Sequence, residues 1–309
     1  MIVVSGEALM DVFDAGATAT GQALDARIGG SPLNVAIGLA RLAQPVAFFG
    51  GLGRGFLGER LKRALADEGV DLSCAKRVDA PTTLGLVGLD AQGVADYAFY
   101  GDGGADRLLQ PADLDAVPAA ADAYHFGSFA MVVQPVGATQ RRLVAREHGR
   151  SVLAYDVNVR TNVEPDLDVW RDSVDWMAAR CSLLKLSDED HERLYPGSDP
   201  DAQAARWLGQ GVSLVVMTRG AQGASAWVHR GGRLDAPPVP TVLVDTVGAG
   251  DTFQAALLTA LAEGGRLHRE GVAALDHAAL APLLHFAARA SAITCARRGA
   301  DLPRRHELI

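Results

Sequence analysis

Two carboxylates and a glycine-rich turn lie within nine residues near the carboxyl end of the chain, in the stretch Asp245-Thr246-Val247-Gly248-Ala249-Gly250-Asp251-Thr252-Phe253. The next residues, 254–262, are rich in Ala and Leu, which predicts a buried helix that begins near Asp251. The small residues before Asp251 would then lie at a helix N-terminus, where unpaired N–H groups and the helix dipole favour an anion. A carboxylate is unusual beside an anion site; the alternative is that Asp251 is a favourable first-turn acid and that the glycines form a tight turn.

A second glycine pair precedes an amide near the start of the chain, in Gly29-Gly30-Ser31-Pro32-Leu33-Asn34. Ser31 fits a helix N-cap and Pro32 the first helical position, so we expect a helix with Asn34 in its first turn. The Asn34 amide offers donors and acceptors that suit vicinal sugar hydroxyls, and the two glycines leave room for a ligand. A local capping bond is the alternative role.

Short apolar runs at 123–126, 152–159, 183–186 and 214–218 alternate with helical stretches. This pattern predicts a parallel sheet with helices on both faces, and such sheets bind ligands at the carboxyl ends of their strands. The candidate residues fall at or just after those ends: Asn158, Arg160, Lys185, Thr218, Gly220 and Gly223. Surface ion pairs are the alternative role for Lys185 and Arg160.

The nine residues from Asp245 to Phe253 resemble, position by position, the C-terminal signature of the ribokinase-like (PfkB-type) carbohydrate kinases. The stretch from Gly29 to Ala36 resembles the G-G-x-x-x-N-x-A motif of the same family. The resemblance implies a ribokinase-like three-layer α/β sandwich with a central, mostly parallel sheet and a small β-sheet lid. It also implies transfer of the ATP γ-phosphate to a sugar hydroxyl.

The resemblance assigns roles around that reaction. Asp251 would take the proton of the sugar hydroxyl, and the N–H groups of Gly248, Ala249 and Gly250 would form an anion hole for the phosphoryl group. The sugar would be bound by Asp11, Gly29, Gly30 and Asn34. Without the resemblance, Asp11 would be interpreted as a solvated loop acid.

On the nucleotide side, Thr218, Gly220 and Gly223 match a T-x-G-x-x-G turn beside the ATP phosphates, and Lys185 would meet the nucleotide. Arg160 matches a residue that reaches the acceptor or the γ-phosphate. The family's N-x-x-E motif, tied to Mg²⁺ through water, is replaced by Ser187-Asp188-Glu189-Asp190, so both ends differ and Asp190 is the remaining magnesium candidate. A monovalent cation, K⁺, would lie between Asp245, Val247 and a loop that contains Arg297 and Gly299.

Residues 82–89 and 94–100 alternate and are joined by Asp90-Ala91-Gln92-Gly93, which predicts a hairpin. Together with residues of about 11–28, the segment of about 82–107 would form the lid of one kinase domain that spans 1–309. Phe99 would face the sugar, or else be a plain core aromatic. A homodimer through the lid is a further expectation.

A rival function rests on Gly53-Arg54-Gly55-Phe56-Leu57-Gly58, the G-x-G-x-x-G pattern of nicotinamide dinucleotide-dependent dehydrogenases. No acidic residue is marked at the end of a following strand, and the stretch also resembles the kinase family's G-x-D-x-x-G helix start, with Gly55 in place of Asp. A third alternative is a sugar-binding relative without catalytic activity, and the presence of Asp251 argues against it.

Composition excludes other classes. The 309 residues are 49% hydrophobic and 21% charged, with a formal net charge of −8, which argues against a nucleic-acid or anionic-membrane surface. Three distant cysteines, Cys74, Cys181 and Cys295, indicate reduced thiols in a cytoplasm. The first residues lack the features of a signal peptide, and the apolar stretch 278–296 contains His285 and Arg289, which favours a core helix over a membrane span.

Within the family, the Gly29–Asn34 motif, the strand Tyr97-Ala98-Phe99-Tyr100 and Lys185-Leu186-Ser187-Asp188-Glu189 look most like bacterial fructokinases. Gly101 stands where sugar-acid kinases of the family tend to carry Arg, which favours a neutral hexose, D-fructose, as acceptor and fructose 6-phosphate as product. Kinases of 2-keto-3-deoxygluconate, or of another sugar or a nucleoside, are the alternatives.

Overall fold

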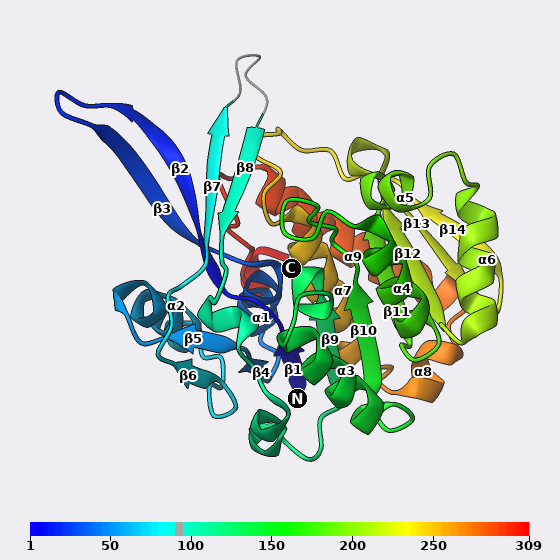
Figure 1. Cartoon of the computed structure of the whole chain (residues 1–309). Helices are drawn as coiled ribbons and strands as arrows, with labels where there is room; N and C mark the ends of the chain where they lie inside the picture. Colours follow the sequence, from blue (N-terminus) through cyan, green and yellow to red (C-terminus); the bar gives the residue numbers. More distant parts are fainter. Residues whose placement is uncertain (90–94, 309) are drawn as a thin grey trace.

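An eight-stranded sheet forms the centre of the molecule (Figure 1). The computed structural model describes residues 1–89 and 95–308. The sheet order is β14-β13-β12-β11-β10-β9-β1-β4; neighbours from β12 to β4 are parallel, whereas β13 and β14 are antiparallel. The strands are β1 (Ile2–Ser5), β4 (Val46–Phe49), β9 (Ala123–Gly127), β10 (Val152–Asp156), β11 (Leu183–Ser187), β12 (Leu214–Thr218), β13 (Ala224–Val228) and β14 (Gly232–Ala236).

The parallel strands are short apolar runs because both faces of the sheet are covered. In β1, Ile2 and Val4 enter one hydrophobic core while Val3 enters the other. One face packs against α1 (Ser31–Arg41), α2 (Phe56–Asp67), α7 (Ala249–Glu263), α8 (Arg269–Ala273) and α9 (His277–Cys295). The other face packs against α3 (Val136–Glu147), α4 (Leu167–Ala178), α5 (Asp188–Leu194) and α6 (Pro200–Gln210). The predicted three-layer α/β arrangement is confirmed.

A separate four-stranded sheet, in the order β3-β2-β7-β8, forms the lid and projects from the body (Figure 1). Its strands are β2 (Leu9–Ala17), β3 (Gln22–Gly29), β7 (Leu84–Leu89) and β8 (Ala95–Tyr100). β7 and β8 are antiparallel, as the alternation predicted, whereas the predicted turn Asp90-Ala91-Gln92-Gly93 lies outside the described residues. A two-stranded parallel sheet of β5 (Gly51–Gly53) and β6 (Lys76–Val78) completes the strands described.

Two helix starts differ from the sequence prediction by a residue or two. Gly30, with φ 105°, is the N-cap of α1, so Ser31 is the first helical residue and not the cap. Gly248, with φ 77°, is the N-cap of α7, which begins at Ala249 and places Asp251 in the first turn. The prediction for Ser31 was wrong because its hydroxyl serves a partner on another helix, as described below.

Helix α9 is long and apolar enough to cross a membrane by length and composition alone. Its apolar residues Leu280, Leu284 and Ala287 belong instead to the core beside α7. The helix is therefore explained as a partly buried core helix, as the sequence predicted.

Candidate active site

Two cavities open at the carboxyl ends of the parallel strands. The lid cavity, of about 450 Å³, lies between the lid strands, the start of α1 and the turn before α7. The strand-end cavity, of about 210 Å³, lies between the ends of β10, β11 and β12 and the start of α7. Four residues line both cavities: Arg160, Glu189, Arg193 and Asp251.

Asp251 is held by two side chains of α1. Ser31 Oγ donates to Asp251 Oδ1 at 2.6 Å, and Asn34 Nδ2 donates to Asp251 Oδ2 at 2.8 Å. Asp251 is 9% exposed, and Ser31 and Asn34 are equally buried. Because each carboxylate oxygen accepts one of these bonds, the side chain is fixed in orientation while its remaining lone pairs stay available for a ligand.

The glycine turn before Asp251 is tightly packed on one side. A Cβ on Gly248 would lie 2.7 Å from the Ala300 Cβ, and the positive φ already disfavours a side chain there. Ala249 is anchored by Ser291 Oγ, which donates to its carbonyl at 3.0 Å. At Gly250, a Cβ would point toward Lys185 Nζ, 3.5 Å away. The first-turn amides of α7 therefore lie close to a buried ammonium group, and this combination favours an anion.

Asp11 and Gly30 form part of one wall of the lid cavity, and Gly29 lies behind Asp11. A Cβ on Gly29 would lie 2.2 Å from Asp11 Oδ2, so Gly29 makes room for the carboxylate without itself lining the cavity. Gly30 does line the cavity. Burial raises the pKa of the Asp11 carboxyl to about 6; the positive charge of Arg160 opposes the rise and Asp251 adds to it.

Phe99, from the lid, and Arg160, from the segment after β10, both line the lid cavity. Phe99, on β8, packs edge-on against Phe129, with ring centroids 6.2 Å apart. It therefore combines the two roles considered from the sequence, a cavity wall and a packed aromatic. Arg160 is exposed, and its Nη1 donates to the carbonyl of Val159 at 2.9 Å.

Lys185 is buried in the strand-end cavity and is not a surface residue. Its Nζ donates to Asp156 Oδ2 at 2.6 Å, and both side chains are at most 4% exposed. Burial raises the pKa of the Asp156 carboxyl to about 6, although the adjacent Lys185 opposes this rise. Thr218 lines the same cavity, so the predicted strand-end residues Lys185 and Thr218 do come together.

Gly220 and Gly223 lie in the turn after β12 and line neither cavity. Their φ angles are 48° and 83°, and Arg219 N donates to the Gly223 carbonyl at 2.7 Å. A Cβ on Gly223 would lie 2.1 Å from the Ala236 carbonyl oxygen. In this structure both glycines are explained by the shape of the turn.

The candidate cation residues are engaged with the backbone. Asp190 forms a capping box with Ser187 at the start of α5 and also accepts a bond from Val159 N at 3.0 Å. Asp245 accepts from Val247 N at 3.1 Å and from Gly299 N at 2.8 Å, so it ties the two loops of the predicted K⁺ site together. Among residues 1–89 and 95–308, no three His, Cys, Asp or Glu side chains converge to hold a metal.

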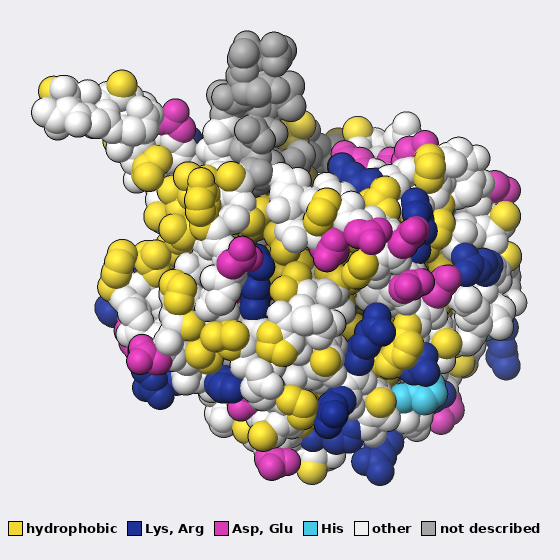
Figure 2. All heavy atoms as spheres, in the orientation of Figure 1, with side chains coloured by type: hydrophobic (Ala, Val, Ile, Leu, Met, Phe, Trp, Pro, Cys, Tyr) yellow, Lys and Arg dark blue, Asp and Glu magenta, His cyan; other side chains and the backbone are white. Residues whose placement is uncertain are grey.

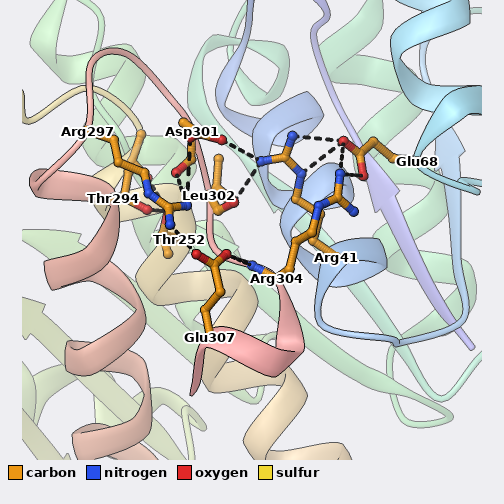
Figure 3. Close-up of polar contacts among 10 residues, drawn as sticks. Arg41, Glu68, Thr252, Thr294, Arg297, Asp301, Leu302, Arg304 and Glu307 are labelled. Carbon is orange, nitrogen blue, oxygen red and sulfur yellow. Dashed lines mark hydrogen bonds and ion pairs between the residues drawn. The ribbon is translucent and has the colours of Figure 1, made fainter. Parts of the chain in front are cut away.

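The Arg297 side chain points toward Asp301 and Glu307 (Figure 3). It forms ion pairs with Glu307 and with Asp301, and its backbone N–H donates to the Thr294 carbonyl at 2.9 Å. Any contact of residue 297 with a cation in the loop would therefore involve its carbonyl group and not its guanidinium.

Three side chains of the site have contacts or positions that the sequence did not predict. Ser31 contacts Asp251, Asp156 pairs with Lys185, and Arg193 lines both cavities. Asp156 could have been suspected, because it is a carboxylate within an otherwise apolar predicted strand, whereas Arg193 had no distinct signal. Their pairing depends on strand register and helix orientation, which the sequence does not specify.

A buried carboxylate at a helix N-terminus, shared by a cavity under a lid and a cavity at the strand ends, defines a small-molecule phosphotransferase site. The sequence profile described as the pfkB family carbohydrate kinase matches residues 1–307. The chain belongs to this family, and the predicted family membership is confirmed.

Relatives of known name are similar over almost the whole chain. A fructokinase of Rhizobium leguminosarum bv. trifolii is 38% identical over 280 residues, 91% of this chain and 85% of that protein. A fructokinase of Klebsiella pneumoniae is 33% identical over 303 residues, 97% of this chain and 94% of that protein. The crystal structure of a fructokinase from Xylella fastidiosa with bound ATP superposes with a TM-score of 0.88 at 25% identity, covering 99% and 96% of the two chains.

The dehydrogenase alternative is not supported. Gly53 ends β5, and Gly55 and Gly58 follow it; β5 belongs to the two-stranded sheet and not to the central one. They line neither cavity, and a Cβ on Gly58 would lie 2.0 Å from the Gly53 carbonyl oxygen. These glycines allow a close turn between strand and helix, and the chain is a carbohydrate kinase by family.

Proposed function

We propose that this carbohydrate kinase transfers the γ-phosphate of ATP to the primary 6-hydroxyl of D-fructose. The observation that carries the proposal is the position of Asp251, whose carboxylate lines both the lid cavity and the strand-end cavity. An acceptor hydroxyl in the first cavity and a phosphate in the second would meet at this side chain. The two named relatives, both fructokinases, support fructose as the acceptor.

Asp251 acts as the general base in the proposed reaction. Its lone pairs accept the proton of the sugar hydroxyl as that oxygen attacks the phosphorus atom, and the bond from phosphorus to the ADP oxygen breaks. The first-turn N–H groups at Gly248, Ala249 and Gly250 stabilise the negative charge on the phosphoryl oxygens. Arg160 and Arg193, which line both cavities, add positive charge where the phosphoryl group crosses.

The nucleotide is proposed to enter the strand-end cavity, with Lys185 and Thr218 near its phosphates and the turn at Gly220 and Gly223 beside them. Glu189 lines the same cavity and is exposed, whereas Asp190 already accepts backbone hydrogen bonds. This donor set fits Mg²⁺, which is usually held by one or two carboxylates, water and substrate phosphates. When bound, Mg²⁺ would neutralise β- and γ-phosphate oxygens, and K⁺ at Asp245 and Val247 would order the turn.

A neutral hexose suits the lid cavity better than a sugar acid. Asp11, Gly30 and Asn34 offer carboxylate, backbone and amide groups that hydrogen-bond hydroxyls. A Cβ on Gly101 would lie 2.5 Å from Arg107 Nη2 and 2.8 Å from Thr83, so an Arg at 101 would need this corner to rearrange. The lid is proposed to close over the sugar and exclude water from the reaction.

The test is a coupled ADP-release assay with D-fructose, 2-keto-3-deoxygluconate, ribose and nucleosides as acceptors. We expect the highest kcat/KM for fructose, and activity that disappears in EDTA and returns with Mg²⁺. A higher kcat/KM for 2-keto-3-deoxygluconate would make that sugar acid the substrate. Full activity in EDTA would remove Mg²⁺ from the proposal.

Two further expectations concern context. ATP and reduced thiols point to a cytoplasmic enzyme.

The lid edge strands β3 and β8 carry exposed Leu24 and Tyr100, and apolar side chains gather where the lid meets the body (Figure 2). These features support a homodimer through the lid, which stays a prediction for sedimentation analysis.

A further inference from the structure

Glu7 lies at the junction of the central sheet and the lid. It follows β1 and precedes β2, and it lines the lid cavity together with Gly30 and Asp11. A Cβ on Gly30 would lie 2.8 Å from the Glu7 carbonyl oxygen, so the glycine brings the two backbones into contact. Glu7 therefore belongs to the same wall as residues that we propose to bind the sugar.

The Glu7 carboxyl group is buried and incompletely satisfied. Glu7 is 1% exposed, and its Oε2 has no hydrogen-bond partner in the described structure. The Ser128 hydroxyl and the Glu7 backbone N–H bond to the carboxyl group. Ser128 also lines the lid cavity, and its φ of 56° is a strained left-handed conformation for a residue other than glycine. A buried oxygen without a partner is costly, and such atoms in a cavity wall indicate a missing ligand.

We propose that Glu7 is a sugar-binding residue whose neutral carboxyl group donates a hydrogen bond from Oε2 to an oxygen of the acceptor sugar. This inference rests on the proposed function and goes beyond it by adding a contact that selects uncharged acceptors. A sugar carboxylate could accept the same bond, but it would also meet the negative charges of Asp11 and Asp251 in the same cavity. A neutral hydroxyl or ring oxygen accepts the bond without that repulsion.

The surroundings of Glu7 favour its neutral form. Burial raises the pKa of the Glu7 carboxyl to about 8. The charged groups that face it are Asp106, which raises the pKa further, and Arg160, which lowers it. Asp106 is itself 1% exposed and accepts a bond from Thr83 Oγ1. The donor is therefore present through neutral pH and is lost at alkaline pH.

The test compares Glu7→Gln, whose amide keeps a donor at every pH, with Glu7→Met, which removes it. The acceptor is whichever sugar the wild type phosphorylates best, at saturating ATP and Mg²⁺. We expect Glu7→Met to raise the sugar KM about tenfold to a hundredfold, while kcat and the ATP KM change less than threefold. Glu7→Gln should stay within about threefold of the wild-type sugar KM at pH 7.

The pH dependence provides a second readout. The wild-type sugar KM should rise about tenfold per pH unit above pH 8, as the donor proton is lost, whereas the KM of Glu7→Gln should stay flat. The matched control is Gln140→Met, because Gln140 is also buried with an unpartnered atom, Nε2, but lies outside the lid cavity. It should lower the melting temperature without changing the sugar KM.

Three results would overturn the proposal. The first is a sugar KM for Glu7→Met within threefold of wild type, and the second is an equal rise of the sugar KM in Glu7→Gln and Glu7→Met. The third is a sugar KM of Glu7→Gln that rises with pH as the wild-type value does. Melting curves identify any variant that fails to fold. If Glu7→Met fails to fold, the pH dependence of the sugar KM in Glu7→Gln decides the test. If the wild type phosphorylates no sugar, the proposed function itself fails, and that result is visible before any variant is made.

Discussion

Two clusters of charged side chains, one around Glu7 and one near the C-terminus, differ in how their polar atoms are satisfied. The cluster around Glu7, here called the cavity floor because Glu7 lines the lid cavity, also contains Asp106 and Arg107, which do not line it. All three residues are at most 9% exposed, and Glu7 Oε2, Asp106 Oδ2 and Arg107 Nε have no partner among the described residues. The C-terminal clamp consists of Arg41, Glu68, Arg297, Asp301, Arg304 and Glu307 (Figure 3). None of its described side-chain atoms is both buried and unpartnered.

The difference separates a binding role from a structural role. Unpaired buried groups lower the stability of the free protein, and one that lies in a cavity wall, as Glu7 does, can be satisfied by a ligand. Paired groups near the surface hold segments together; here the clamp fixes the loop whose Ala300 packs against Gly248. We therefore expect changes near the cavity to alter kinetic constants, and changes in the clamp to alter mainly stability.

The largest effect is expected for Asp251→Asn. The amide keeps the size of the side chain, but it cannot accept the sugar proton, so kcat should fall by about 10² to 10⁴. Sugar and ATP should still bind, which calorimetry on the same preparation measures. The control is Asp301→Asn in the clamp, with kcat expected within threefold of wild type. Turnover of Asp251→Asn within a few-fold of wild type would remove this residue from the mechanism.

The next effect distinguishes two residues of the lid cavity. Asp11→Ala should raise the sugar KM by about one to two orders of magnitude and leave kcat nearly unchanged, because the side chains that hold Asp251 in the described structure are Ser31 and Asn34. Asn34→Ala should also lower kcat, since Asn34 Nδ2 orients Asp251. Steady-state kinetics with fructose checks both. An equal loss of ATP affinity in either variant would indicate a folding defect.

Much of the site could be predicted because its strongest signals are local. The glycine turn with Asp251, and Gly30 with Asn34, are contiguous motifs, and the rule for parallel sheets brings strand ends to one edge. Burial and pairing could not be predicted in the same way. The Lys185–Asp156 pair depends on the register of β10 and β11. The position of the Glu7 carboxyl group, whose Oε2 has no partner, depends on Ser128, which is distant in sequence.

The fold was predicted to a similar extent. Alternation of strands and helices gave the layers, whereas the antiparallel edge of β13 and β14 has no distinct sequence signal. The Ser31 hydroxyl was assigned to a local cap because N-capping is its commonest use, yet it bonds Asp251 across the helix pair. Local propensity failed at the position where tertiary structure builds the site.

A smaller effect concerns the stability of the cavity floor. Because burial raises the Glu7 pKa from 4.5 to about 8, its stabilising contribution is complete below pH 4.5 and is lost as the pH rises through 8. Residue 7 does not titrate in Glu7→Gln. The melting temperature of Glu7→Gln minus that of the wild type should therefore increase by several degrees from pH 5 to pH 9. Gln140→Met should show no such gain, and an unchanged difference would contradict a raised pKa.

The smallest effect is expected in the clamp, and it completes the comparison. Arg41 contacts Glu68, Asp301 and the Leu302 carbonyl with a side chain 18% exposed, so Arg41→Met should cost about 1 to 2 kcal/mol of unfolding free energy. The Arg304 side chain is 52% exposed and shares Glu68, and its replacement by Met should cost less than about 0.5 kcal/mol. Denaturant unfolding of both single variants and the double variant measures these costs and their coupling through Glu68. The fructose KM should stay within twofold of wild type throughout, since no clamp residue lines either cavity. A tenfold change in the fructose KM for Arg304→Met, with stability unchanged, would mean that the clamp takes part in sugar binding. The pairing of charged groups would then not distinguish residues that bind the ligand from residues that stabilise the fold.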